Sequence, residues 1–250
     1  MNIDVINKML IAVQSMRHYH RHEIRGLHHI PSNGPVLLVV NHSLATYDIM
    51  LLTGDIYLET GRITRHLVDR LFFRIPLLAK LIVECGGVEG APDAARKLLD
   101  AGEIVCLAPG GMREALRPSS ERYQIRWDRR MGFAKLAITA QVPIILAACP
   151  KADDLYDVID NPLTKWIYQQ YKLPLVLARG FGFSIFPRPV KLTHFLSEPI
   201  QPPPIPASGR MPGVVQDFQH YLIRRMNLLI GEAVTFHPSS KGEKLLSRPR

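Results

Sequence analysis

Cysteine is scarce in this chain. Its 250 residues include only three, Cys85, Cys106 and Cys149, and each lies in an apolar stretch. Their number is odd, and their spacing matches neither a disulfide framework nor a zinc site. We therefore predict buried, reduced thiols in a reducing compartment and no bound metal.

Long uninterrupted apolar runs are also missing. A membrane-spanning helix needs about 20 mostly apolar residues. The most apolar segments, 71–83, 134–150 and 173–187, are broken by charged residues or proline, or are too short. The first residues lack the basic start and apolar stretch of a secretory signal. The sequence predicts a protein that is soluble or lies on a membrane without crossing it.

Acidic residues are outnumbered by basic ones. The chain has 31 Lys and Arg against 22 Asp and Glu, a formal net charge of +9, with 47% hydrophobic residues. That hydrophobic content is typical of a folded chain, and the length suits one domain. The positive balance favours an anionic partner, which is a nucleic acid, an anionic membrane surface or a phosphorylated substrate.

A basic run between residues 113 and 135 leaves three interpretations open. It holds seven Lys or Arg and three acidic residues, a net charge of +4, with Tyr123 and Trp127 interleaved. Nucleic-acid binding uses such a pattern through phosphate contacts and stacking. A membrane interface or a nucleotide-bearing acyl donor uses it equally well. A solvated surface is the ordinary explanation, and we predict no specific nucleic-acid partner.

Five of the ten histidines lie between residues 18 and 29. On a helix, His18 and His22 share one face and His20 does not. No cysteine is near, and Glu23 is the nearest acid, so the cluster does not predict a metal site.

The apolar periodicity predicts strands alternating with helices. Residues 4–22 form an amphipathic helix with a basic flank, which lies either in a membrane interface or on the protein's own core. Strands are expected at 23–27, 35–40, 63–68, 104–108, 143–148 and 190–196, and further helices at 48–58, 71–84 (started or bent near Pro76), 92–100, 131–140, 161–171 and 214–233. This order predicts an α/β domain over 23–235, with a mostly parallel central sheet flanked by helices, and a flexible basic tail over 236–250.

His42 and Asp48 follow one of these strands. Histidine suits proton transfer near neutral pH, and a carboxylate that binds the second ring nitrogen fixes its tautomer. Asp48 fulfils this role if the loop 43–47 folds back. The alternative is structural: Asp48 caps the next helix and His42 bonds to a backbone carbonyl.

A second motif, Pro109-Gly110-Gly111-Met112-Arg113-Glu114, follows the strand at 104–108. Two glycines permit a tight turn that brings amide groups close to a ligand. Arg113 offers a planar fork suited to phosphate or carboxylate. A plain turn with a surface Arg113–Glu114 pair is the alternative.

Taken together, the motifs resemble those of the glycerolipid acyltransferase superfamily. The matching blocks are Asn41-His42 with Asp48, the segment 109–116, and Val142-Pro143-Ile144-Ile145. The spacing from His42 to Asp48 and the Gly-Gly-Met-Arg-Glu-Ala block look most like the branch of transmembrane protein 68 and the diacylglycerol acyltransferases. Additional similar stretches are 23–27, 123–127, 129–134 and 189–192.

This resemblance implies an enzyme that transfers a fatty acyl group from acyl-CoA or acyl carrier protein to a lipid hydroxyl. His42 and Asp48 would be catalytic, and Gly110, Gly111, Arg113 and Glu114 would bind substrate. No metal or redox cofactor is implied. The chain would lie on the cytoplasmic side of a membrane as a peripheral or monotopic protein. The alternative is a non-catalytic membrane-surface lipid-binding protein that retains the acyltransferase fold.

One segment departs from the family pattern. Residues 85–90 contain no arginine, although relatives that act on phosphorylated acceptors usually carry one there. The departure implies a neutral or differently charged acceptor rather than a lysophosphatidate.

Overall fold

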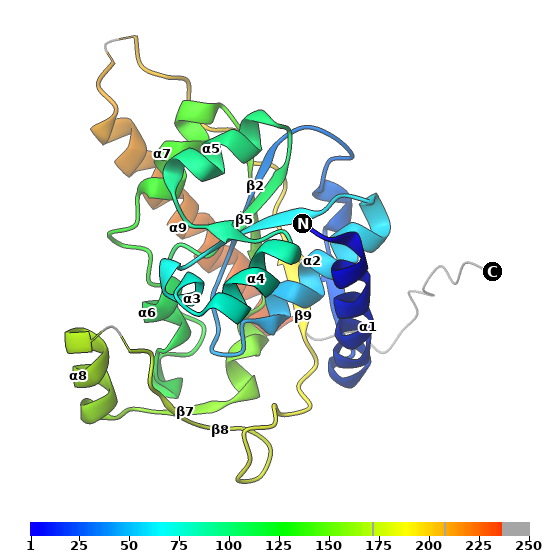
Figure 1. The fold of residues 1–250 in the computed structure, drawn as a ribbon. Coiled ribbons are helices and arrows are strands. Elements are labelled where there is room, and N and C mark those ends of the chain that lie inside the picture. The colour runs from blue at the N-terminus through cyan, green and yellow to red at the C-terminus, as the bar shows by residue number, and fades with distance from the viewer. Residues whose placement is uncertain (172, 208, 237–250) are drawn as a thin grey trace.

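A seven-stranded sheet forms the centre of the computed structural model, which describes residues 1–171, 173–207 and 209–236 (Figure 1). The strands are β1 (Glu23–Arg25), β2 (Val36–Val40), β3 (Thr64–Val68), β4 (Val88–Glu89), β5 (Ile104–Leu107), β6 (Ile144–Ala148) and β9 (Thr193–Leu196). Their order is β1-β9-β6-β2-β5-β3-β4. Every neighbouring pair is parallel except β6 and β9. The predicted α/β class with a mostly parallel sheet is confirmed.

The middle strands are buried on both faces, as parallel strands between helices are. Successive side chains of β2 point to opposite faces. Val36, Leu38 and Val40 belong to one apolar core, and Leu37 and Val39 to another. The helices over the two faces are α2 (Tyr47–Thr60) on one side and α5 (Pro92–Asp100), α7 (Gly132–Ala140) and α9 (Pro212–Thr235) on the other.

Helix α1 (Ile3–His20) packs against the outer side of α2 (Figure 1). Gly54 of α2 permits the close approach, because a β-carbon there would lie 3.2 Å from Leu10 and 3.4 Å from Val13. The apolar stripe predicted over 4–22 therefore packs on the protein's own core, which is one of the two alternatives for this segment. Helix α1 belongs to the same folded unit as the sheet.

Several local features refine the predicted pattern. The break expected near Pro76 separates α3 (Arg70–Phe73) from α4 (Pro76–Glu84), because proline lacks an N–H and favours the first turn of a helix. A small antiparallel sheet, β7 (Asp157–Ile159) and β8 (Leu177–Arg179), flanks α8 (Pro162–Tyr171) and was not predicted.

Two expectations concern the membrane and the C-terminus. Within the ranges that the structure describes, no helix combines the length and the apolar character needed to cross a bilayer. Residues 237–250 of the predicted flexible tail lie outside the described residues.

Candidate active site

Four segments that are distant in sequence meet at one edge of the sheet. The carboxyl ends of the parallel strands β2, β5 and β6 lie side by side and lead into His42, Gly110 and Cys149. Strand β9 runs antiparallel to β6, so its amino end brings His194 to the same edge. Ligands of open α/β sheets bind outside the carboxyl ends of the strands. The two predicted motifs are therefore brought together where a site is expected.

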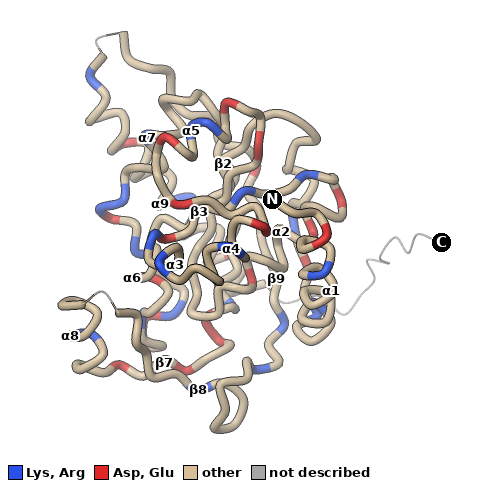
Figure 2. The backbone as a smooth tube through the Cα atoms, in the orientation of Figure 1, with Lys and Arg blue, Asp and Glu red and all other residues tan. Residues whose placement is uncertain are grey.

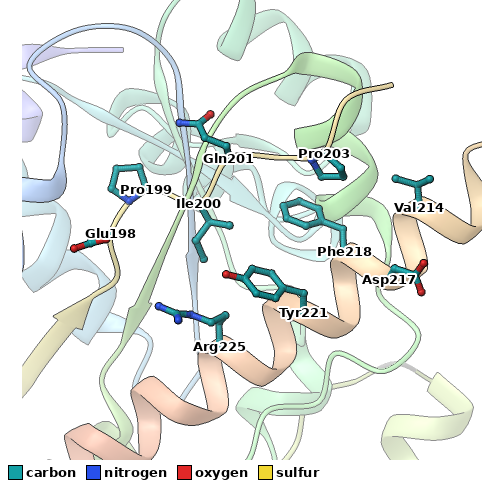
Figure 3. Close-up of a pocket in the computed structure, with 10 residues that line it drawn as sticks. All are labelled: Glu198, Pro199, Ile200, Gln201, Pro203, Val214, Asp217, Phe218, Tyr221 and Arg225. Atoms are coloured by element: carbon teal, nitrogen blue, oxygen red, sulfur yellow. The ribbon is translucent and has the colours of Figure 1, made fainter. Parts of the chain in front are cut away.

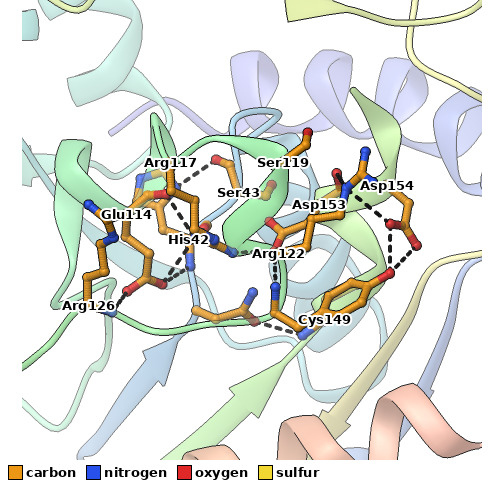
Figure 4. Close-up of polar contacts among 12 residues, drawn as sticks. His42, Ser43, Glu114, Arg117, Ser119, Arg122, Arg126, Cys149, Asp153 and Asp154 are labelled. Carbon is orange, nitrogen blue, oxygen red and sulfur yellow. Dashed lines mark hydrogen bonds and ion pairs between the residues drawn. The ribbon is translucent and has the colours of Figure 1, made fainter. Parts of the chain in front are cut away.

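The backbone of His42 is held from two sides (Figure 4). Its N–H donates to Oε1 of Glu114 at 2.6 Å, and its carbonyl oxygen accepts from Nη1 of Arg117 at 2.6 Å. Both partners are charged groups, and charge-assisted hydrogen bonds are the stronger kind. The two bonds fix the position from which the imidazole projects.

The ring of His42 is held by its own loop. Its Nδ1 lies 2.9 Å from the carbonyl oxygen of Ser43. Because a carbonyl only accepts, Nδ1 carries the proton and Nε2 of the neutral ring keeps its lone pair. Burial lowers the pKa of His42, the Ser43 carbonyl opposes this, and the charge of Arg117 lowers the pKa further. A neutral ring with an unprotonated Nε2 is what a general base requires.

Asp48 does not bind the ring of His42. Its Oδ1 accepts from Oγ of Ser43 at 3.1 Å, and no hydrogen bond or ion pair between described residues joins Asp48 to His42. The direct contact expected from the sequence is therefore absent, because Ser43 stands between the two groups. For His42 the alternative matches the structure, since a backbone carbonyl fixes its tautomer, but Asp48 lies inside the first turn of α2, where Thr46 is the N-cap residue and no side-chain hydrogen bond caps the helix.

The carboxyl group of Asp48 is almost completely buried, with 1% of the residue exposed. Burial raises the pKa of Asp48 to about 7; the Ser43 hydroxyl opposes the shift, and the charge of Asp153 adds to it. The folded protein therefore retains a proton that the unfolded chain releases near pH 4. The resulting stabilisation is fully present below pH 4 and is lost as the pH rises through about 7.

Replacing Asp48 by asparagine should accordingly stabilise the protein above neutral pH. Asparagine has the shape of the protonated acid and carries no charge to desolvate. We expect a gain of the order of 2 kcal/mol at pH 8 and a smaller one at pH 5, measured by urea unfolding. Asp55→Asn, on the same helix, is the matched control and should lose stability, because Asp55 pairs with Arg17 and His22. A loss for Asp48→Asn at pH 8 would contradict the prediction.

Glu114 has a different role from the one predicted. It is fully buried; Oε1 accepts from the N–H of His42, and Oε2 accepts from the N–H of Arg126 at 2.8 Å. Both oxygens are engaged, so Glu114 positions the backbone around His42, and its buried carboxylate is not exposed to a ligand. Gly110 makes room for it, because a β-carbon at Gly110 would collide with the Glu114 carboxylate.

The second glycine forms the turn itself. Gly111 has a φ of +53°, which favours glycine, and it begins the short helix α6 (Gly111–Ala115). Its N–H donates to the carbonyl of Ala108 at 3.1 Å. This amide is therefore engaged and is not available to a ligand, in contrast to the prediction from the motif.

Arg113 is exposed on α6, as a ligand-binding side chain must be. Burial and then the charge of Arg113 lower the pKa of Arg126. Burial raises the pKa of Tyr168, and the charges of Arg130 and Arg113 oppose that shift. Arg113 therefore lies near Arg126, which pairs with Glu121, and both Arg113 and Arg130 lie near Tyr168, as does Asp69. The basic groups outnumber the acidic ones here, which favours an anionic ligand.

Two important residues were missed by the sequence interpretation. Arg117 is one of the basic run between residues 113 and 135, yet it is buried and forms a short ion pair with Asp153 (Figure 4). Asp153 also accepts from the N–H of Tyr123 at 2.8 Å. The spacing of Arg117 after Glu114 was visible, but nothing in the sequence indicated that Asp153, 36 residues later, is its partner.

The basic run as a whole does not form a stacking surface for nucleic acid. Trp127 has no exposed surface and packs against Phe133 at a ring-centroid distance of 5.4 Å. Its ring belongs to the core beside α7. The aromatic part of the nucleic-acid interpretation is therefore wrong for Trp127.

The N-terminal histidines do not form one group, although the rings of His28 and His29 lie 4.2 Å apart between their centroids. His20 uses Nδ1 on the carbonyl of Val190 and Nε2 on the hydroxyl of Tyr47. His22 bonds instead to Asp55 and His194. The cluster seen in the sequence is thus divided between separate polar contacts.

A cavity of about 740 Å³ lies apart from this site, between residues 198–203 and α9 (Figure 3). Ile200 in its wall pairs with Ile144 at the amino end of β6, whereas His42 lies near the carboxyl end. A five-residue strand spans roughly 15 Å. The cavity is therefore at the opposite edge of the sheet from His42.

Comparison with known proteins supplies a family context. A family model described as Acyltransferase matches residues 21–149, just over half of the chain. Proteins of Bos taurus and Homo sapiens, each named "DGAT1/2-independent enzyme synthesizing storage lipids", are 32% identical over 183 residues, or 73% of this chain and 53% and 54% of theirs. An uncharacterized protein of Mycobacterium leprae is 27% identical over 194 residues, or 76% of this chain and 49% of its own.

The chain spans about half the length of the curated relatives it matches. Among solved structures, the 1-acyl-sn-glycerophosphate acyltransferase PlsC from Thermotoga maritima aligns with a TM-score of 0.48 and 16% identity. That alignment covers 85% of this chain and 77% of the other.

Proposed function

Because this chain belongs to the acyltransferase family, we propose that it transfers a fatty acyl group from an acyl thioester to the hydroxyl group of a lipid. The donor is acyl-CoA or acyl carrier protein, and the acceptor is a mono- or diacylglycerol or a lysophospholipid. The observation that carries the proposal is the state of His42. Its backbone is fixed, its Nδ1 is bonded to a carbonyl, and its Nε2 is left as a base.

In the proposed reaction, Nε2 of His42 removes the proton of the acceptor hydroxyl while the oxygen attacks the thioester carbonyl carbon. The new C–O bond leaves a negative charge on the carbonyl oxygen. The N–H of Gly110 donates to no acceptor within the described ranges, and we propose that it donates to that oxygen. Such a donor is worth about 3 kcal/mol. The C–S bond then breaks, and His42 returns its proton to the departing thiolate.

Arg113 is proposed to bind an anionic group of the donor or the polar head of the acceptor. Its exposure and its cationic neighbours Arg126 and Arg130 support this role. Phosphates of coenzyme A or of a carrier-protein arm fit a planar guanidinium.

Among these acceptors, we propose that the neutral mono- and diacylglycerols are preferred over a lysophospholipid. The segment 85–90 lacks an arginine, and Arg70, which reaches Glu89 from α3, is engaged by that carboxylate at 2.6 Å. The mammalian relatives are named for the synthesis of storage lipids, which suits an uncharged glycerolipid.

Lipid profiling of cells that express wild type or His42→Ala tests the function. We expect one acylated lipid class to accumulate only with the wild type, and its structure names the acceptor. Identical profiles, together with binding of the protein to lipid vesicles, would contradict enzymatic acyl transfer. They would favour the alternative of a non-catalytic lipid-binding protein.

The protein is proposed to work at the cytoplasmic surface of a membrane, where a lipid acceptor resides. The main support is an apolar tip, residues 181–186, beyond β8. Phe183 is 96% exposed and Ile185 is 86% exposed. The tip is ordered, because the N–H of Phe181 donates to the carbonyl of Phe186 at 2.7 Å. Exposed apolar clusters of this kind mark interaction sites.

Basic residues surround the base of this tip. The tip itself has no charged residue, as Figure 2 shows for the loop beyond β8. Arg122, Arg179 and Arg188 converge at its base on the carboxylate of Asp157, and Arg122 also pairs with Asp154, which leaves one positive charge from three minus two. An apolar tip above a cationic base matches the hydrocarbon and anionic headgroup layers of a membrane.

The tip is also connected to the active site. The N–H of Val158 in β7 donates to Oγ of Ser119 at 2.8 Å. Ser119 lies four residues after Ala115, the last residue of α6. Insertion of the tip would therefore place the edge of the sheet that carries His42 toward the lipid.

Replacing Phe183 and Ile185 together by serine should release the protein from vesicles. Each side chain contributes about 1.5 kcal/mol or more when it leaves water, so we expect at least a hundredfold lower partition coefficient. Sedimentation with vesicles that contain anionic lipid measures it. Leu228→Ser is the matched control, since Leu228 is 61% exposed on α9, away from the tip. Equal binding of both variants would show that the contact lies elsewhere.

A further inference from the structure

A line of buried polar side chains runs inward from α1 to Asp48. Asp48 and Asp55 lie two turns apart on one face of α2, and His22 and His194 lie between the two carboxylates. The successive distances are 3.0 Å from Arg17 Nε to Asp55 Oδ1, 3.1 Å from Asp55 Oδ2 to His22 Nδ1, 2.8 Å from His22 Nε2 to His194 Nδ1, and 3.9 Å from His194 Nε2 to Asp48 Oδ2.

These residues are sealed from water. None of the four residues His22, His194, Asp48 and Asp55 is more than 8% exposed. Asp48 is almost completely buried, and its Oδ2 has no hydrogen-bond partner among the described residues. A buried unpartnered carboxylate oxygen is costly and calls for an explanation.

The positions of the protons along this line explain the unpartnered oxygen of Asp48. Asp55 pairs with Arg17 and is therefore an acceptor, so Nδ1 of His22 carries a proton. Nε2 of neutral His22 then accepts from the Nδ1–H of His194. This leaves Nε2 of His194 as a lone pair that faces Oδ2 of Asp48. Two acceptors enclosed opposite each other need one additional proton.

We propose that His22 and His194 form a buried proton relay with Asp48, which binds one shared proton and sets the charge that Asp48 presents to the loop of His42. His194 and His22 are then positioning residues for the acyl transfer, acting through Asp48 and Ser43. This inference rests on the proposed function for its catalytic part, and on geometry alone for its proton-binding part.

The proton moves as follows. Before the reaction it resides on Asp48, whose neutral carboxyl faces His194. When His42 takes the acceptor's proton and becomes cationic, Asp48 passes its own proton to Nε2 of His194. His194 then passes the proton on its Nδ1 to Nε2 of His22, beside the carboxylate of Asp55. Asp48 is then a carboxylate, and the positive charge lies on His22, which is further from His42 than His194 is. The gap of 3.9 Å must shorten by about 1 Å for the first transfer.

Other titratable groups also face Asp48. The neighbouring groups are the hydroxyl of Tyr47, the thiol of Cys106 from β5, the thiol of Cys149 after β6 and the carboxyl of Asp153. Burial raises the pKa of both thiols, so they stay neutral and do not supply the charge that is exchanged with His194.

The pH dependence of His194→Gln tests the relay. Glutamine retains an amide near the ring position but cannot take up a proton. We expect kcat to fall about tenfold or more with KM unchanged within about twofold, and the pH profile of kcat to lose one ionisation. A variant profile that overlays the wild-type profile after scaling by a constant would show a merely structural role and overturn the proposal.

His29→Gln is the matched control. His29 is half-buried and bonds to the carbonyl of Leu196 at the end of the same strand, β9. It takes no part in the line of buried groups, so its pH profile should keep the wild-type shape.

A measurement on the wild-type chain covers the case in which His194→Gln fails to fold. In the full chain labelled with ¹⁵N-histidine, both rings should be neutral with the proton on Nδ1, and the Nε2 signal of His194 should shift as the pH rises and the proton held by Asp48 is lost. A resting His194 that carries its proton on Nε2, or a His194 Nε2 signal that does not change with pH, would overturn the relay. This arm does not require activity, so it separates failure of the relay from failure of the proposed function.

Metal analysis tests whether a metal ion, and not a proton, lies between Nε2 of His194 and Oδ2 of Asp48. Ligand atoms of Asp48, Cys149 and His194 lie within 4.8 Å of one another, a set that zinc also accepts. We expect no stoichiometric zinc after incubation of the wild-type protein with zinc chloride and desalting. One equivalent that is lost in His194→Gln would assign the gap to a cation and overturn the proton relay.

Discussion

Replacing His42 by alanine is expected to lower kcat/KM for acyl transfer by about 1,000-fold, because it removes the base while leaving its surroundings intact. The bonds from Glu114 and Arg117 go to the backbone of His42 and persist in the variant. The fold should therefore be retained, which a melting curve checks. Release of free coenzyme A from acyl-CoA in the presence of lipid acceptor measures the rate.

The pH profile adds a second readout to this prediction. Because burial lowers the pKa of His42, the ring stays neutral to a lower pH than an ordinary histidine. The acidic limb of kcat/KM should accordingly lie below pH 6.5, with activity lost as the ring becomes protonated. Residual activity of His42→Ala within a few-fold of wild type would exclude His42 as the base.

The second large effect concerns stability. Arg117→Met should destabilise the protein by about 3–5 kcal/mol, because it leaves Asp153 buried without its guanidinium partner. It also removes the donor to the carbonyl of His42. For a chain of this size, the loss corresponds to a melting temperature lower by about 6–20 °C. Thermal and urea unfolding of the purified variant measure it.

Arg113→Met is the matched control, with the same substitution four residues earlier. Arg113 is exposed, so the change should stay within about 0.5 kcal/mol. Adding Asp153→Leu to Arg117→Met should restore part of the lost stability, since it removes the unpaired buried charge. Similar losses for Arg113→Met and Arg117→Met would refute the assignment of a buried ion pair.

Local pattern was sufficient to predict much of the fold. The apolar runs at 36–40 and 144–148 are strands because they are buried on both faces, which a continuous apolar segment signals well. The helix at Pro92–Asp100 was predicted with the observed bounds, because proline begins it and Gly102 follows its end. Such features depend on neighbours in sequence.

Site residues were predictable from the sequence only where a single short motif contains them. His42 and Arg113 were identified from their motifs, and the structure places both at the carboxyl edge of the sheet. The roles of Ser43, Glu114 and Arg117 were not predicted, because each depends on a partner brought in by the fold. The distance from Asp48 to His42 is similarly decided by the path of the loop 43–47, which the spacing of the two residues does not fix.

The pairing of β1 with β9 has a consequence for how the protein is made. It joins Glu23–Arg25 to residues 193–195, so two strands must meet across about two thirds of the chain. Contacts of such long sequence separation slow folding, because the intervening chain must lose its freedom before the contact forms. During synthesis, His22 and Asp48 leave the ribosome long before His194. We expect a nascent chain stopped before β9 to lack this corner of the sheet, so that the catalytic edge is completed only late in translation.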